Sequence, residues 1–304
     1  MKTDFYYQSG TGVRLHGCKW TPEGKALGVV QLVHGIAEHV ERYDAFARFL
    51  NERGFVVVAE DHMGHGQSVV KGELGYFRQG WTAAVEDTYQ LLQDTKTAYP
   101  DVPYFLLGHS MGSFLSRSLL ILHPDCGLSG CILSGTGWQP EAVLRTGLGL
   151  CRVTAKARGD RYHSTALNNL IFGNYNARVE HRRTEFDWLT RDDQIVDAYI
   201  ADPLCGFVPS VGLLGNVMEG MLFNQKKTNL QQMNQTQPVL FVSGDADPVG
   251  GYGKGVSRCR EAFCESGMKN TELKLYPLCR HEILNEWNCN QIFEDIYGWI
   301  VEKC

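Results

Sequence analysis

The sequence that most constrains this chain is GHSMG at residues 108–112, where a serine stands two positions from each of two glycines. The residues in front of it, 104–107, are apolar or aromatic and predict a buried strand. Behind it, apolar residues recur at three- and four-residue steps until Pro124, which predicts a helix. A serine on such a strand–turn–helix corner has the setting of a nucleophile elbow, and its glycines allow the two backbones to approach closely. We therefore expect Ser110 to be a nucleophile rather than an ordinary turn residue.

Strands and helices are expected to alternate along most of the chain. Continuous apolar strands of this kind are typical of a mostly parallel sheet that helices cover on both faces. The sequence thus predicts the α/β class. The predicted strands are residues 3–8, 13–20, 27–33, 55–59, 104–107, 130–134, 238–242 and 271–276, and the predicted helices are residues 40–50, 81–97, the segment after Ser110, and 285–301.

The alternation stops after residue 138. No buried strand is evident from residue 139 to residue 236, and this stretch is too long for a loop in a compact domain. We expect residues 1–138 and 237–304 to form the catalytic domain. Residues 139–236, called the insertion below, are expected to form a mainly helical cap.

An apolar stretch within the insertion, residues 208–223, has several side chains at helical spacing. Leu214, Met218 and Met221 are its candidate substrate-binding residues, and its three glycines are expected to loosen packing or permit movement. The alternative is that the stretch only packs the insertion against the sheet, since most apolar stripes belong to a core.

A serine hydroxyl needs a base, and the base needs an orienting acid. In folds with this elbow the three follow the order serine, acid, histidine. Only His281 of the ten histidines lies after residue 181, and it stands just past the last predicted strand. The acid should follow the strand before that one, where Asp245 and Asp247 are available. We favour Asp247, because an aspartate at 245 is well placed to satisfy N–H groups of the turn.

The oxyanion of an acyl-transfer reaction requires donors that are already in place. One is expected to be the backbone N–H of Met111, the residue after the nucleophile. The other is assigned to the N–H of Ile36, in the loop after the strand at residues 27–33. His34, which precedes Gly35 in that loop, is expected to shape the loop, and the same structural role is expected of the histidines at 62, 65 and 109.

The chain resembles the α/β-hydrolase superfamily, and within it the bacterial type of the monoacylglycerol lipase and lysophospholipase-like group, also described as serine aminopeptidase-like. The resemblance implies the α/β-hydrolase fold with an inserted cap, Asp247 as the acid, and cofactor-free hydrolysis of a lipid monoester, such as a monoacylglycerol or lysophospholipid, through an acyl-enzyme. It lies in HGIAEH at 34–39 with Arg42 and Tyr43, DHMGHGQS at 61–68, GHSMG at 108–112, GDAD at 244–247, RHE at 280–282 and, in the insertion, residues 186–192 and 202–207.

Several alternatives stay open within this resemblance. The substrate could be a short-chain or aryl ester, a thioester or a small amide. A rival of another class is a catalytically silent small-molecule binder on the same scaffold, although three intact reactive residues speak against it.

Composition limits the partners. The net charge of -5 gives no reason to bind nucleic acid. No run of about 18 apolar residues predicts a spanning helix, although the apolar insertion would permit peripheral contact with a membrane. The ten cysteines and the histidines have no spacing typical of a zinc site, so no metal is expected. No phosphate-binding or dinucleotide-binding glycine motif is complete, and no cofactor is expected. The first residues lack the apolar core of a signal peptide, and we therefore expect a cytoplasmic protein with reduced thiols.

Overall fold

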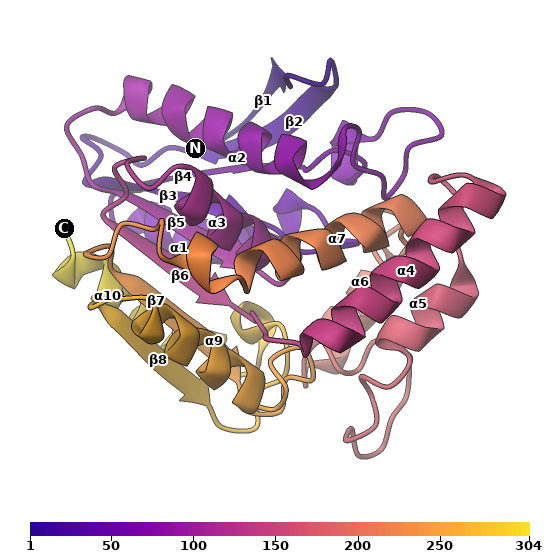
Figure 1. Cartoon of the computed structure of the whole chain (residues 1–304). Helices are drawn as coiled ribbons and strands as arrows, with labels where there is room; N and C mark the ends of the chain where they lie inside the picture. Colours follow the sequence, from indigo (N-terminus) through magenta and orange to yellow (C-terminus); the bar gives the residue numbers. More distant parts are fainter.

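An eight-stranded sheet forms the centre of the computed structural model, which describes residues 1–304 (Figure 1). The strand order is β1-β2-β4-β3-β5-β6-β7-β8. The pairs β1–β2 and β2–β4 are antiparallel and every other pair is parallel, so the predicted mostly parallel sheet is confirmed. The strands are β1 (Lys2–Gln8), β2 (Arg14–Trp20), β3 (Gly28–Val33), β4 (Phe55–Glu60), β5 (Tyr104–His109), β6 (Gly130–Ser134), β7 (Val239–Gly244) and β8 (Thr271–Tyr276).

Helices cover both faces of the sheet, as the continuous apolar strands predict. Alternate strand residues separate the two cores: Val30 faces the core that includes α1 and α10, whereas Val29 faces the core that includes α2, α3 and α9. Three short 3₁₀ turns lie at Val40–Tyr43, Gly66–Ser68 and Ile283–Asn285. The five helices named here are α1 (Asp44–Glu52), α2 (Gly80–Ala98), α3 (Met111–Leu122), α9 (Lys254–Glu265) and α10 (Cys289–Glu302).

The insertion contributes helices and no strand to the fold, and α4 and α5 project beyond the sheet at the right of Figure 1. The helix α7 joins it to the helix α3 that covers the sheet: Asn224 donates to the carbonyl of Phe114 on α3 at 2.8 Å. The division into a catalytic domain and a cap at residues 139 and 236 stays a prediction. The helices are α4 (Glu141–Arg158), α5 (Thr165–Phe172), α6 (Asp193–Ala201), α7 (Val211–Asn224) and α8 (Lys227–Leu230).

Two details differ from expectation. Gly220 on α7 does not loosen packing: a Cβ there would lie 2.1 Å from the ring of Trp81, so the glycine lets α7 pack closely on α2. The helix α9 was not predicted, although Val256, Cys259 and Phe263 are buried at its three- and four-residue steps. No helix is both long enough and apolar enough to span a membrane.

Candidate active site

Ser110 occupies the sharp corner between β5 and α3. Its backbone angles are φ 52° and ψ -120°, a left-handed region that a side chain rarely adopts. The strands and helix approach closely here, since a Cβ on Gly112 would lie 2.0 Å from the carbonyl oxygen of Val33. Only glycine fits at 112, and the strained corner lifts the serine above the end of the parallel strands.

Asp247 and His281 meet beyond the ends of β7 and β8. His281 Nδ1 lies 3.0 Å from both carboxylate oxygens of Asp247. Asp247 is fully buried and also accepts the Val249 N–H at 2.8 Å and the Ser243 hydroxyl at 3.2 Å. The carboxylate is thus held from three sides, which fixes the orientation of the imidazole that it contacts.

The pKa of His281 is raised above its ordinary value of 6.5. Burial by itself lowers this pKa, but the negative charge and hydrogen bond of Asp247, together with the charges of Glu282 and Glu38, outweigh burial. The surroundings therefore favour the imidazolium, which is the form that a base reaches after it takes a proton.

Asp245 lies apart from this pair. It is exposed and accepts the backbone N–H of Leu278 at 2.7 Å. Asp245 therefore accepts a hydrogen bond from a backbone N–H group of a turn, as the sequence suggested. Of the two aspartates, the geometry favours Asp247 as the partner of the histidine.

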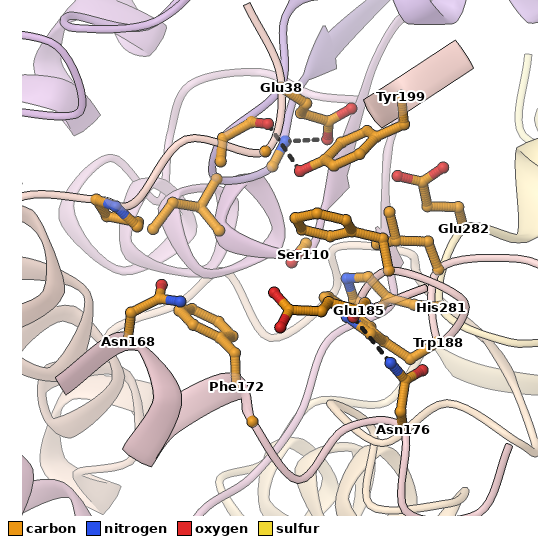
Figure 2. Close-up of a pocket in the computed structure, with 18 of the residues that line it drawn as sticks. Glu38, Ser110, Asn168, Phe172, Asn176, Glu185, Trp188, Tyr199, His281 and Glu282 are labelled. Atoms are coloured by element: carbon orange, nitrogen blue, oxygen red, sulfur yellow. Dashed lines mark hydrogen bonds between the residues drawn. The ribbon is translucent and has the colours of Figure 1, made fainter. Parts of the chain in front are cut away.

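Ser110 and His281 line one cavity, and Figure 2 draws them close together. No hydrogen bond joins the serine hydroxyl to the imidazole in this structure. Such contacts are often long without substrate and tighten when it binds. The structure thus brings the nucleophile and base candidates to one cavity wall.

The backbone N–H groups of Ile36 and Met111 donate to no acceptor within the protein. Both residues line one cavity together with Ser110. The preceding N–H, that of Gly35, is held by Glu38 Oε1 at 2.6 Å. A Cβ on Gly35 would lie 3.1 Å from the Ser110 side chain, so this loop runs directly beside the nucleophile. Two free donors beside a serine are what an oxyanion requires.

A network of buried charged side chains supports the loop that contains Gly35 and Ile36. No role was predicted for these charged residues from the sequence. Arg42 donates to Glu38 at 2.8 Å and to both oxygens of Glu282 at 2.6 Å. Burial raises the pKa of Glu38, whereas the guanidinium of Arg42 overcomes burial at Glu282 and lowers its pKa to about 2. All three residues lie in segments that carry the family resemblance, but the sequence did not reveal that they meet. The network connects the loop before Ile36 with the residue after His281.

The insertion docks on the same two loops. Tyr199 on α6 donates its hydroxyl to the carbonyl of Ala37 at 2.9 Å. The Glu282 N–H donates to the carbonyl of Leu189 at 2.7 Å, and Trp188 places its ring 5.1 Å from that of His281. The insertion therefore forms one wall of the site.

The first of two cavities at Ser110, called the apolar cavity, has a volume of about 590 Å³. Leu214, Met218 and Met221 on α7 line it, as predicted for residues near substrate, although their role in binding stays a prediction. Sequence reasoning missed its opposite walls, because apolar residues on α4 and α5 gave no sign of which face they present. Those walls include Val143, Leu144, Leu150, Leu170 and Ile171.

The second cavity, called the polar cavity, has a volume of about 510 Å³ (Figure 2). It is also lined by Ser110, and it shares Ile36, Phe172 and Trp188 with the apolar cavity. Its walls carry amides and carboxylates. These include Glu38, Asn168, Asn169, Asn174, Asn176, Glu185 and Glu282.

The remaining histidines near the site are buried. His34 accepts the backbone N–H of His62 at 3.0 Å, and His65 bonds the carbonyl of Met63, so these side chains shape loops as expected. The ring of His109 lies 4.6 Å from that of His281. Burial, aided by His281, lowers the pKa of His109 well below 6.5.

Two groups of side chains have ligand atoms close enough for a metal ion, Asp4 with His16 and Cys18, and His39 with Asp202 and Cys205. Each histidine already bonds an aspartate directly, His16 to Asp61 at 2.7 Å and His39 to Asp202 at 2.8 Å. Neither group contains Ser110, Asp247 or His281.

Comparison with known proteins agrees with this geometry. The family model of the serine aminopeptidases, S33, matches residues 24–288. The chain is 31% identical to the monoacylglycerol lipase of Mycolicibacterium smegmatis, covering 95% of this chain and 94% of that protein. It is 28% identical to the mouse monoglyceride lipase, over 93% and 86%. Among solved structures, a carboxyl esterase from Bacillus coagulans in complex with glycerol superimposes with a TM-score of 0.92 at 31% identity, over 99% and 98%.

Proposed function

Because the chain belongs to the serine aminopeptidase S33 family of hydrolases, we propose that it cleaves lipid monoesters of the monoacylglycerol kind through an acyl-enzyme on Ser110. The observation that carries the proposal is that Ser110 lines both an apolar and a polar cavity. An ester of a fatty acid with a polyol has one apolar and one polar half. Such a molecule fits with its carbonyl at the serine, its acyl chain in the apolar cavity and its alcohol in the polar cavity.

The proposed chemistry uses the groups already described. His281 takes the proton of the Ser110 hydroxyl while its oxygen attacks the carbonyl carbon, and Asp247 holds the resulting imidazolium. The N–H groups of Ile36 and Met111 stabilise the tetrahedral oxyanion. His281 then gives the proton to the leaving alcohol, and water repeats the two steps to release the fatty acid.

The apolar cavity supports a preference for longer acyl chains. Each buried methylene contributes roughly 0.8 kcal/mol before entropy losses. We expect KM to fall as the chain grows from acetyl toward a medium-length acyl group. An enzyme fastest on acetyl esters would instead be a small-ester esterase.

A lipid substrate implies access to lipid surfaces. Val143, Leu150 and Leu170 line the apolar cavity and are also 58%, 41% and 65% exposed. Apolar side chains exposed at a cavity mouth support peripheral contact of α4 and α5 with a lipid surface. A cytoplasmic location is also proposed, and ten cysteines without a disulfide support a reducing compartment.

A fluorophosphonate probe tests the reaction class. We expect the wild type to be labelled and Ser110→Ala to resist labelling. Release of fatty acid from monoacylglycerols of increasing chain length then tests the substrate class. A wild-type protein that resists the probe, or a Ser110→Ala variant labelled as strongly, would favour the silent small-molecule binder. Faster cleavage of thioesters, amides or aryl esters than of any monoacylglycerol would reject the lipid substrate but keep the enzyme.

A further inference from the structure

The polar cavity contains one carboxylate that nothing in the protein neutralises. Glu185 lines this cavity, and its side chain makes no hydrogen bond and no ion pair in the structure. Figure 2 draws its carboxylate pointing into the cavity that Ser110 and Phe172 also line. The other two carboxylates of the lining, Glu38 and Glu282, share the single guanidinium of Arg42.

The backbone around Glu185 is fixed. Its carbonyl accepts the Asn176 amide at 2.8 Å, and the same amide bonds the carbonyl of Thr184 at 3.1 Å. Asp187 holds the Thr184 hydroxyl at 2.5 Å and the Arg183 N–H at 2.5 Å. A loop tied in this way holds the backbone of Glu185 at the cavity wall, and its exposed carboxylate extends from there.

The surroundings of Glu185 add acceptors and aromatic faces. Asn176 is 7% exposed and leaves its Oδ1 without a hydrogen-bond partner. Phe172, Trp188 and Tyr199 line the same cavity. A carboxylate with nearby aromatic rings attracts ammonium groups and accepts hydroxyl hydrogens, whereas it repels phosphate.

Arg182 is the only arginine or lysine in the lining and could oppose this effect. It is exposed, as Glu185 also is, and its Nε donates to the carbonyl of Thr184 at 3.1 Å. It forms no ion pair with Glu185. Counting Arg42, the cavity and its supporting network hold three carboxylates against two guanidinium groups, and Glu185 is the one carboxylate of the three that no guanidinium pairs.

We propose that Glu185 makes the polar cavity select leaving alcohols by charge, in the order cationic, then neutral polyol, then anionic. This inference rests on the proposed function, in which the polar cavity receives the alcohol of the ester. It separates the two lipid classes that the family resemblance leaves open. Esters of glycerol or of amino alcohols would be substrates, and lysophospholipids with an uncompensated phosphate charge would be poor ones.

The test compares octanoyl esters of choline, glycerol and glycerol phosphate with p-nitrophenyl octanoate as a reference without a charged alcohol. We expect kcat/KM for the choline ester to exceed that for the glycerol phosphate ester by at least about tenfold, and Glu185→Gln to lose most of this ratio. About 0.5 M salt should also lower the ratio in the wild type. Glu180→Gln, an exposed acid of the insertion outside the cavity lining, is the matched control and should keep the ratio.

The outcomes are distinguishable. Cleavage of the p-nitrophenyl ester with no ranking by charge, or a ranking that Glu185→Gln leaves intact, would overturn the inference and leave the proposed function standing. A preference for the phosphate ester that Arg182→Gln removes would overturn it in favour of Arg182. Failure to cleave any of the four esters would overturn the proposed function and this inference together.

Discussion

The edge of the sheet and the insertion face each other across Ser110, and they hold their side chains differently. At the sheet edge, both oxygens of Asp247 are buried and bonded, and His281 is oriented by them. In the insertion, Met218 packs against apolar side chains, and the side chain of Glu185 makes no hydrogen bond and no ion pair. The difference agrees with our proposal that the sheet edge carries out the reaction, whereas the insertion selects the ester.

The largest effect should come from the sheet edge. Asp247→Asn should lower kcat by about 10⁴-fold, because an amide cannot hold the imidazole in the required tautomer or stabilise its charge. Asp245→Asn should change kcat by less than about twofold, because Asn keeps the oxygen that accepts the Leu278 N–H. Steady-state kinetics on one monoacylglycerol measures both variants. A larger loss with Asp245→Asn would show that the acid is wrongly assigned.

The pH dependence of kcat/KM should also be set by residues at the sheet edge. His281 must be neutral to accept a proton, and its pKa is raised, so kcat/KM should fall as pH drops through a value above 6.5. Glu282→Gln removes one of the charges that raise this pKa, so the acid limb should move to lower pH. A pH–rate profile measures the midpoint, and Glu180→Gln in the insertion should leave it in place. A limb that moves to higher pH in Glu282→Gln would contradict this account.

The structure of the sheet edge could be predicted from the sequence more fully than that of the insertion. Strands such as β8, residues 271–276, are continuous apolar or alternating runs, and Ser110 and His281 follow from a local motif and from chain order. The predicted α/β-hydrolase fold, the family and the ester hydrolase class are confirmed by the sheet and by the relatives. The cavity walls were not predictable beyond α7, because which faces of α4 and α5 meet depends on tertiary packing. The meeting of Arg42 with Glu282 joins residues 240 positions apart, and no local pattern encodes it.

A charge in the apolar cavity should affect binding more than chemistry. Met218 lines this cavity and is half-buried, so Met218→Glu should raise KM for a long-chain monoacylglycerol by about tenfold or more, with little change for an acetyl ester. Val153→Glu provides a matched control, because Val153 is 69% exposed on α4 and outside the lining. Equal changes in KM for both esters would indicate that α7 only packs the insertion onto the sheet.

The smallest effect on activity is expected far from both regions. Asp87 on α2 is 4% exposed, and Ser9 donates to its Oδ1 at 2.6 Å while its Oδ2 has no partner. Burial, with the nearby charge of Glu60, raises the pKa of Asp87 from 3.8 to about 7. This carboxyl contributes nothing to the cavities that meet at Ser110.

The raised pKa fixes the sign of its effect on stability. Between pH 3.8 and about 7 the folded state binds a proton that the unfolded state has lost, so stability decreases as pH rises through this window. Asp87→Asn keeps the shape without the charge and should stabilise the protein by roughly 2 kcal/mol at pH 8, with no gain near pH 4. Thermal unfolding at the two pH values measures this, and kcat on a monoacylglycerol should stay within about twofold. A variant that gains stability but loses activity would contradict this prediction. It would show that a core residue outside the sheet edge influences the reaction.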